Sequence, residues 1–239
     1  MSHCSSLTHM KIYVINLDER QDRLTSLDSE IKKFGFEAIR IPAINANELN
    51  ESNYPFVSRE VAACFLSHIK ALDTFIDSGD MYGLIVEDDF QVLKKFPISL
   101  TLMMGNLNFL QIGFLKTSIF ERFAIVYQNI WNFALGILLR LGTQFNVYQS
   151  ILHRFLLQER KGVSLAIVLN DVRPGAHAYI VDRKFAMYCR QINNPIALSA
   201  DALFIAISQM RTVKMGRTRK SYVGQSKSST SIIQRFKSL

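Results

Sequence analysis

An apolar run that ends in three consecutive carboxylates is the feature that most constrains the fold of this chain. Residues 84–86 are Leu-Ile-Val, which favours a strand buried on both faces, and Glu87, Asp88 and Asp89 follow directly. Three unpaired acids cannot all be buried in a low-dielectric core, so we expect the strand to end there, facing solvent or a cation. Ligands of open α/β sheets bind at strand carboxyl ends. Neighbouring carboxylates suit Mg²⁺ or Mn²⁺, which in turn hold phosphate oxygens; the alternative is a solvated acidic turn.

The segments around this strand alternate between strand and helix patterns. Residues 11–17 predict a first strand, a helix follows through Leu24, Leu27 and Ile31, and residues 36–41 predict a second strand. This βαβ opening predicts a parallel sheet with helices on its faces. Later elements are expected at 59–78 (helix), 82–90 and 108–113 (strands), 176–181 (strand), 183–192 (helix) and from Ser199 (helix). The expected fold class is α/β, with a Rossmann-like, mostly parallel sheet flanked by helices.

The positive charge of the chain is concentrated at its C-terminal end. The formal net charge is +8, and the eight cations that follow the last acid, Asp201, equal that excess. They are Arg211, Lys214, Arg217, Arg219, Lys220, Lys227, Arg235 and Lys237. A neutral body with a basic end argues against a nucleic-acid-binding protein. We therefore divide the chain into an N-terminal extension (1–10), a single domain (11–210) and a basic, extended tail (211–239).

The sequence shows no export or membrane-spanning signal. Cys4, Cys64 and Cys189 have no pairing or metal-binding spacing, as expected in a reducing cytosol. The first ten residues lack a basic region followed by an apolar one, and no run of about 18 apolar residues occurs. We therefore expect a cytoplasmic protein.

Six short pieces of the sequence occur in an order that resembles a known family. They are Val14–Leu17 with Arg20 and Arg23, Glu60–His68, Leu84–Asp89, Leu110–Gly113, Ala178–Val181 with Arg183, Lys184 and Ala186, and Ala200-Asp201. Together they are similar to glycosyltransferase family 25, the bacterial lipooligosaccharide galactosyltransferase type. The Leu66-Ser67-His68 element combined with Glu87-Asp88-Asp89 is the most specific part. The resemblance implies a GT-A-like sheet.

The sequence also departs from this family in places. The family usually has Ser at the position of Asp182, Pro-Val where this chain has Ser199-Ala200, and commonly Gly at Ala63. Residues 114–173 match no family pattern and are rich in Phe, Leu, Ile and scattered arginines, which predicts helices on the acceptor side. These departures keep open a second reading, a catalytically inactive glycan- or nucleotide-binding module on the same fold.

The resemblance implies transfer of a sugar, most often galactose, from a UDP-sugar to a saccharide hydroxyl in surface-glycan assembly. A divalent cation, Mn²⁺ or Mg²⁺, would neutralise the diphosphate leaving group. We expect Asp89 as its first ligand and Glu87 as its second, because alternate strand residues point the same way. Asp88 would face the other side and contact the sugar or ribose.

Further residues are expected around the donor. Asn16, Leu17, Arg20 and Arg23 follow the first strand, where nucleotides sit in doubly wound sheets, although solvated surface ion pairs are an equal alternative for Arg23. Ser67-His68 would contact nucleotide or acceptor, unless His68 is a hydrogen-bonded structural group.

Asp201 and the basic tail complete the expectations. Inversion at the anomeric carbon needs a general base, and Asp201 is the candidate; the alternative is an acid that interacts with a helix dipole. The acceptor is expected to be lipid-linked. The eight cations of the tail are then expected to bind the anionic inner face of the cytoplasmic membrane, unless they form a solubilising segment.

Overall fold

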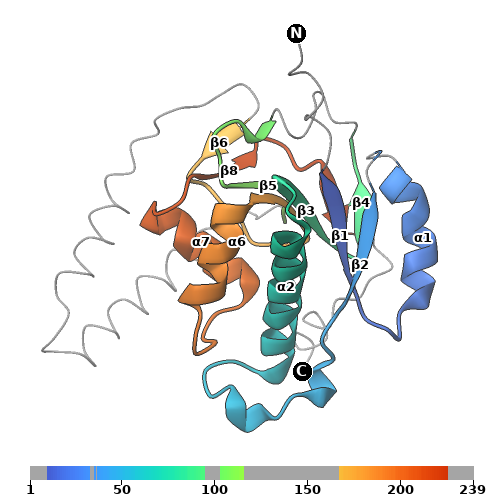
Figure 1. Cartoon of the computed structure of the whole chain (residues 1–239), viewed down its shortest axis with the longest axis vertical. Helices are drawn as coiled ribbons and strands as arrows, with labels where there is room; N and C mark the ends of the chain where they lie inside the picture. The colour runs from blue at the N-terminus through green and yellow to red at the C-terminus, as the bar shows by residue number, and fades with distance from the viewer. Residues whose placement is uncertain (1–9, 33–34, 36, 95–102, 116–166, 226–239) are drawn as a thin grey trace, which may run out of the picture. The chain divides into compact units, whose positions relative to one another are not determined.

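The computed structural model describes residues 10–32, 35, 37–94, 103–115 and 167–225, and these form a nine-stranded sheet with helices packed on it (Figure 1). The strand order is β2-β1-β3-β7-β5-β8-β6, while β9 pairs with both β4 and β5. The strands are β1 (Lys11–Asn16), β2 (Ala38–Pro42), β3 (Tyr82–Glu87), β4 (Phe90–Val92), β5 (Phe109–Gly113), β6 (Ile167–Leu169), β7 (Ala178–Asp182), β8 (Met215–Thr218) and β9 (Val223–Gln225).

Six of these nine strands run in one direction. β1 is parallel to β2 and β3, and β5 is parallel to β8 and β9. β7 joins the two groups because it is antiparallel to both β3 and β5; β4 and β6 are the other reversed strands. The sheet is therefore mixed but mostly parallel, and the expected α/β class is confirmed.

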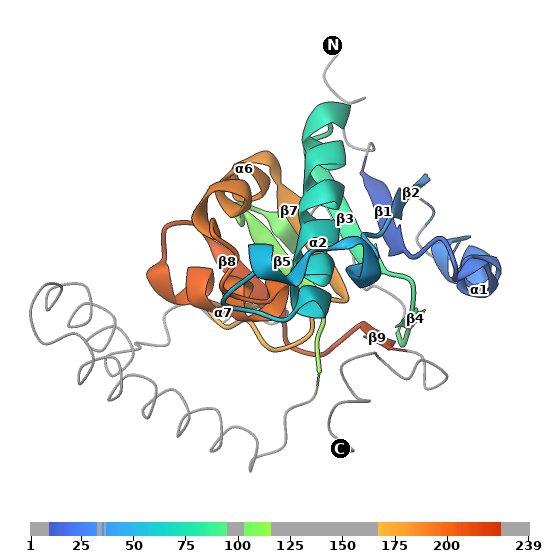
Figure 2. The same cartoon turned by 90° about the horizontal axis from the view of Figure 1, so that it is seen from below.

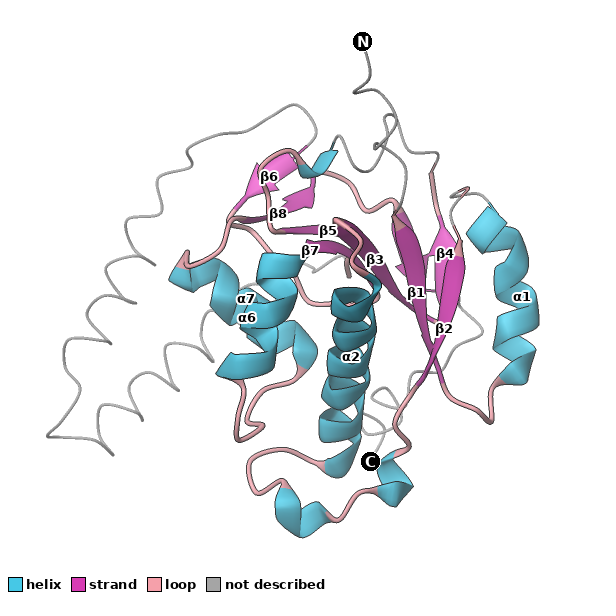
Figure 3. Cartoon of the chain, viewed as in Figure 1, coloured by secondary structure: helices cyan, strands magenta, loops and turns pink. Residues whose placement is uncertain are grey.

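The helices cover the two faces of the sheet unequally. α2 (Arg59–Ser78), α6 (Arg183–Ile192) and α7 (Ala200–Met210) lie together, whereas α1 (Gln21–Lys32) stands apart, beside β1, β2 and β4 (Figure 3). The view from below shows the same separation (Figure 2). Alternation along β3 places Ile85 in the core under α2, α6 and α7, while Leu84 and Val86 face the core that includes Leu27 of α1.

Local signals explain why several predicted boundaries agree with the structure. The Ser58 hydroxyl accepts a hydrogen bond from Val61 N and caps α2, and Gly79 ends that helix in the left-handed conformation with φ of 74°. Two short 3₁₀ helices, Ala46–Glu48 and Glu51–Asn53, lead from β2 to α2. Asp182 and Ser199 cap α6 and α7 in the same way. Two of the departures from the family pattern are thus residues that begin helices well.

The acidic stretch differs from its predicted form. β3 ends at Glu87, Asp88 and Asp89 form a turn, and Phe90 begins a separate strand, so residues 82–90 are not one strand. The turn keeps the carboxylates of Asp88 and Asp89 outside the hydrogen-bonded part of the sheet, inside which no donor group would be available to them. Because Asp89 lies beyond the strand, strict alternation does not determine its direction.

The chain after residue 210 also needs correction. β8 lies beside β5 and is buried throughout, and β9 continues the sheet as far as Gln225. Arg217, a supposed tail cation, is buried; its Nε donates to Asp171 Oδ2 at 2.9 Å, and its guanidinium lies 5.2 Å from the Phe114 ring centroid. The tail is therefore shorter than expected, and residues 226–239 lie outside the described part.

The helices predicted within 114–173 fall mostly outside the described residues, as do most of the N-terminal residues 1–10. No helix in the described part is long and apolar enough to cross a membrane.

Gly83 of β3 provides a test of the packing under α2. A Cβ atom there would lie 2.7 Å from Phe75 Cδ2 and 3.1 Å from Tyr13 Cε2. We expect Gly83→Ala to lower the free energy of unfolding by about 1–3 kcal/mol, because the added methyl overpacks the core. Urea unfolding measures this loss. The loss should shrink in a Phe75→Leu background, where the ring edge is gone; equal losses in both backgrounds would contradict this contact.

Candidate active site

The candidate site lies where the carboxyl ends of β1 and β3 meet the start of β7. Glu87 N donates to His177 O at 3.1 Å, so the acidic end of β3 is fixed against the residue that precedes β7. The contacts of Glu87 and Asp88 place these two neighbours in different side-chain clusters.

The first cluster, called the Asp88 cluster, consists of Asn16, Arg23, Arg40 and Asp88. Asn16 is buried; its Nδ2 donates to Asp88 Oδ2 at 2.8 Å and to the Arg20 carbonyl at 3.0 Å. Its Oδ1 accepts from Arg40 Nε at 3.0 Å. Arg23 Nη1 donates to Asp88 Oδ1 at 2.5 Å. Asp88 therefore fixes Arg23 at the edge where a nucleotide would sit.

Arg20 and Leu17 have more peripheral places. The Leu17 carbonyl accepts from Arg20 N at 2.9 Å and closes the turn between β1 and α1. The Arg20 guanidinium donates twice to Asp22, at 3.1 Å each, on the exposed surface. The two arginines do not act as a pair, since Arg20 forms a surface ion pair and Arg23 binds Asp88.

The second cluster, called the His68 cluster, consists of Cys64, His68, Glu87 and Tyr179. His68 Nδ1 is 2.9 Å from the Tyr179 hydroxyl, and His68 Nε2 is 3.4 Å from Glu87 Oε1. Cys64 lies one helical turn before His68 on α2, and its thiol belongs to the same group. Ser67 has a separate role: its hydroxyl accepts from Ile44 N at 2.9 Å and donates to Ala63 O, which holds the loop after β2.

Opposite charges govern the protonation of this cluster. Burial acts to lower the pKa of His68, but hydrogen bonds with Cys64 and Glu87, and their negative charge, raise that pKa to about 10. Burial acts to raise the pKa of Glu87, but the bond and the charge of His68 bring it below its ordinary value. Around neutral pH the pair is therefore a buried imidazolium beside a partly exposed carboxylate.

Asp201 lies in the first turn of α7, next to these charges. Its Oδ2 accepts from Gly175 N at 2.8 Å. Burial raises the pKa of Asp201, and the negative charge of Glu87 raises it further, while the Gly175 bond and the positive charge on His68 oppose that shift. A carboxyl of raised pKa close to a strand-end site is suited to accept a proton.

His177 is a further buried group at this edge. Its Nε2 lies 3.4 Å from Val223 O, and its Nδ1 has no hydrogen-bond partner among the described residues. Burial lowers the pKa of His177, and the charge of Glu87 only partly offsets this. His177 is thus a neutral imidazole beside β3, and Gly113 leaves room for it, because a Cβ there would lie 2.8 Å from its ring.

The sequence reasoning missed part of this arrangement. Tyr179 was given no role, and Cys64 was set aside as lacking metal-binding spacing, although Cys64 and His68 have the four-residue spacing that places two ligands on one helix face. Tyr179 contacts His68, about a hundred residues earlier, and Gly175 contacts Asp201, about twenty-five residues later. A local sequence pattern does not predict contacts over such separations.

The acids fit a hard divalent cation only in part. Both carboxylate oxygens of Asp88 already accept hydrogen bonds, from Asn16 and Arg23, so Asp88 is not assigned as a metal ligand. Glu87 is partly exposed and Asp89 lies two residues further, in the turn. A cation held mainly by phosphate oxygens needs only one or two protein carboxylates, and the pair Glu87 and Asp89 suits that donor chemistry.

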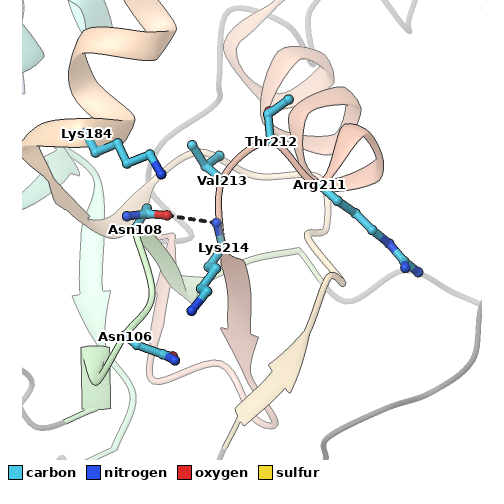
Figure 4. Close-up of a pocket in the computed structure, with 7 residues that line it drawn as sticks. All are labelled: Asn106, Asn108, Lys184, Arg211, Thr212, Val213 and Lys214. Carbon is cyan, nitrogen blue, oxygen red and sulfur yellow. Dashed lines mark hydrogen bonds between the residues drawn. The ribbon is translucent and has the colours of Figure 1, made fainter.

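A basic pocket at the opposite edge of the sheet is separate from this site (Figure 4). It has a volume of about 310 Å³ and lies at the amino ends of β5 and β8. Its lining includes Lys184, Arg211 and Lys214. Asn108 is used by the protein itself: its Oδ1 accepts from Lys214 N at 2.8 Å, and its Nδ2 donates to Asp182 at 2.6 Å.

The comparisons with known proteins differ in strength. No curated protein matches the sequence. Among solved structures, the chain is similar to the crystal structure of A197 from STIV, with 11% sequence identity and a TM-score of 0.43, over 90% of this chain and 83% of that chain. The sequence model of glycosyltransferase family 25, described as LPS biosynthesis protein, matches residues 9–204. That range contains both clusters and Asp201, and the chain therefore belongs to glycosyltransferase family 25, the glycosyltransferases of lipopolysaccharide biosynthesis.

Proposed function

We propose that the protein transfers a hexose, galactose, from a UDP-sugar to a saccharide acceptor in lipooligosaccharide or lipopolysaccharide assembly. One observation carries the proposal: the end of β3 holds an arginine on one face and a carboxylate beside Asp201 on the other. This arrangement supports a site in which the Arg23 guanidinium binds the diphosphate and Asp201 accepts a proton. Family membership supplies the reaction class.

The Asp88 cluster is proposed to receive the donor. Arg23 is partly exposed although Asp88 holds it, so the positive charge of its guanidinium can attract a diphosphate. Asn16, Leu17 and Arg20 shape the adjoining turn, where the backbone approaches a nucleotide in sheets of this kind. On this view Asp88 orients Arg23, and the sugar or ribose contact expected of Asp88 is secondary.

The opposite face is proposed to perform the transfer. Asp89 and Glu87 would hold Mn²⁺ or Mg²⁺, which supplies neutralisation of the departing diphosphate when it is bound. Asp201 accepts the proton of the acceptor hydroxyl. The hydroxyl oxygen forms a bond to the anomeric carbon while the bond from that carbon to the diphosphate oxygen breaks, which inverts the anomeric configuration. Ser67 and His68 support this face from α2.

The decisive experiment supplies purified protein with UDP-galactose or UDP-glucose, with and without Mn²⁺. We expect metal-dependent release of UDP and a rise in the unfolding temperature with the donor, since binding to the native state stabilises it. Neither release nor stabilisation with any UDP-sugar would overturn the proposal. Stabilisation without turnover, across a broad panel of saccharide acceptors, would favour the inactive binding module.

Arg23 provides a sharper test of donor binding. Arg23→Gln removes the charge at the strand edge, and we expect KM for the UDP-sugar to rise by about tenfold or more, with a smaller change in kcat. The control is Arg59→Gln, because Arg59 at the start of α2 pairs with Glu60 and not with Asp88. Steady-state kinetics measure both variants. Equal KM values for the two would contradict the donor-binding role of Arg23.

Asp201 gives a pH dependence with a defined sign. The base works only when deprotonated, so kcat/KM should rise with pH through the pKa of Asp201, and burial moves that limb above the ordinary range of an aspartate. Asp201→Asn should lower kcat by about 10²–10⁴-fold and abolish the limb. Glu60→Gln is the matched control, since Glu60 also lies in the first turn of a helix. A similar small effect of both changes would leave only a helix-dipole role for Asp201.

We also propose that the protein binds peripherally to an anionic membrane. Residues 226–239 contribute Lys227, Arg235 and Lys237, while Arg219 and Lys220 are exposed between β8 and β9. Each cation near such a surface contributes at most about 1 kcal/mol, and less at high salt. We therefore expect salt-sensitive sedimentation with vesicles that contain anionic lipid.

A truncated protein for this test must keep β8 and β9, because both strands belong to the sheet. A stop after Gln225 removes three cations but keeps β8 and β9, and it should weaken vesicle sedimentation at low salt. Adding Arg219→Glu and Lys220→Glu should weaken it further. Equal sedimentation of the full chain and both variants would show that these cations do not attach the protein to a membrane.

A further inference from the structure

Three metal-ligating side chains of different chemistry converge beside β3. One ligand atom each from Cys64, His68 and Glu87 lies within 4.8 Å of the other two. Cys64 and His68 come from successive turns of α2, and Glu87 faces them from the end of β3. Among the described residues, no other set of three or more such side chains meets this spacing.

The spacing of these atoms suits a tetrahedral metal ion. His68 Nε2 and Glu87 Oε1 are 3.4 Å apart, which is longer than the usual 2.7–3.2 Å of an N–H···O bond. Zinc bonds of about 2.0 Å to nitrogen and oxygen and about 2.3 Å to sulfur give ligand-to-ligand edges of roughly 3.3–3.7 Å in a tetrahedron. The nitrogen and oxygen are thus already at such an edge, and the sulfur needs to move by up to about 1.3 Å.

The surroundings hold His68 in the orientation that a metal requires. Its Nδ1 lies 2.9 Å from the hydroxyl of Tyr179, so Nε2 is the nitrogen that faces Glu87. The imidazole also packs edge-on against Phe204, with ring centroids 6.3 Å apart. Metal-binding histidines are typically oriented by such a partner on the second nitrogen. Cys64 is exposed, which gives an ion access from solvent.

We propose that Cys64, His68 and Glu87 form a site for zinc or a similar transition metal, with a fourth position open to water or a ligand. A thiolate and a carboxylate carry two negative charges, which match a divalent ion, and sulfur with nitrogen selects zinc or cobalt over magnesium or manganese. This inference does not depend on the proposed sugar transfer. Glu87 is common to both sites, so an ion here leaves Asp89 as the carboxylate for the phosphate-bound cation.

Cobalt and zinc binding to the metal-free full-length protein test the site. With Co²⁺ we expect one equivalent per chain and a thiolate-to-cobalt charge-transfer absorption, and zinc should displace the cobalt and protect Cys64 from a maleimide. Cys64→Ser should abolish the absorption and weaken zinc binding by at least 100-fold. Tyr179→Phe removes only the hydroxyl and should weaken zinc about 10–100-fold.

Matched controls separate this site from other thiols. Cys189 is buried in the core and Cys4 lies outside the described residues, so Cys189→Ala and Cys4→Ser should leave the cobalt absorption unchanged. Circular dichroism confirms that each variant is folded, and Cys64→Ser changes only an exposed position. Absent zinc binding at micromolar concentration, or zinc affinity unchanged by Cys64→Ser, would overturn the proposal whatever the transferase assay shows.

Discussion

The Asp88 carboxylate is the buried charge on which the donor side of the molecule depends. It accepts from Asn16 on β1 and from Arg23 on α1, so one side chain joins two strands and a helix. Breaking a buried ion pair of this kind typically costs about 3–5 kcal/mol, because the remaining charge is left without a partner. Since Asp88 follows Glu87 directly, fixing one of them also fixes the face on which the other lies. A single strand end thereby supplies both halves of the site.

On the other face, an aromatic core holds the acidic and basic groups in place. Tyr179 stacks on Phe109 with centroids 5.3 Å apart and meets Phe204 edge-on at 5.0 Å. Its hydroxyl points back to His68, so a large apolar ring carries a polar contact that positions the imidazole. β7, α2 and α7 thus meet at this histidine, and Asp201 enters the same region through the first turn of α7.

The sequence was most informative where the determining signals are local. Helix α2 was predicted correctly because Ser58 caps it and Gly79 ends it, and α6 follows Asp182 for the same reason. The end of β3 was placed too late, since hydrophobic runs do not show where a ladder stops. The strands β8 and β9 were mistaken for a tail, because their membership of the sheet depends on pairing with β5, about a hundred residues earlier.

The site, too, was predictable from local sequence pieces but not from long-range contacts. Family pieces named most of its members, and the resemblance itself is confirmed by the match over residues 9–204. A division of Glu87 and Asp88 between two faces could be expected from the sequence, although Asp88 lies in the turn after β3. The partners could not: Arg23 and Asp88 are 65 residues apart and His68 and Tyr179 are 111 apart, so only the folded chain shows which charges meet.

The strand order has a consequence for how the chain is made. β7 lies between β3 and β5 but is synthesised well after both, and β8, the other neighbour of β5, comes later still. On the ribosome, β1, β2 and β3 can pair early, yet one edge of β3 and both edges of β5 remain open. Open strand edges are templates for pairing with other chains. A chain that ends before residue 178 therefore exposes strand edges that can pair with other chains. The middle of the sheet is completed only when β7 and β8 have been synthesised.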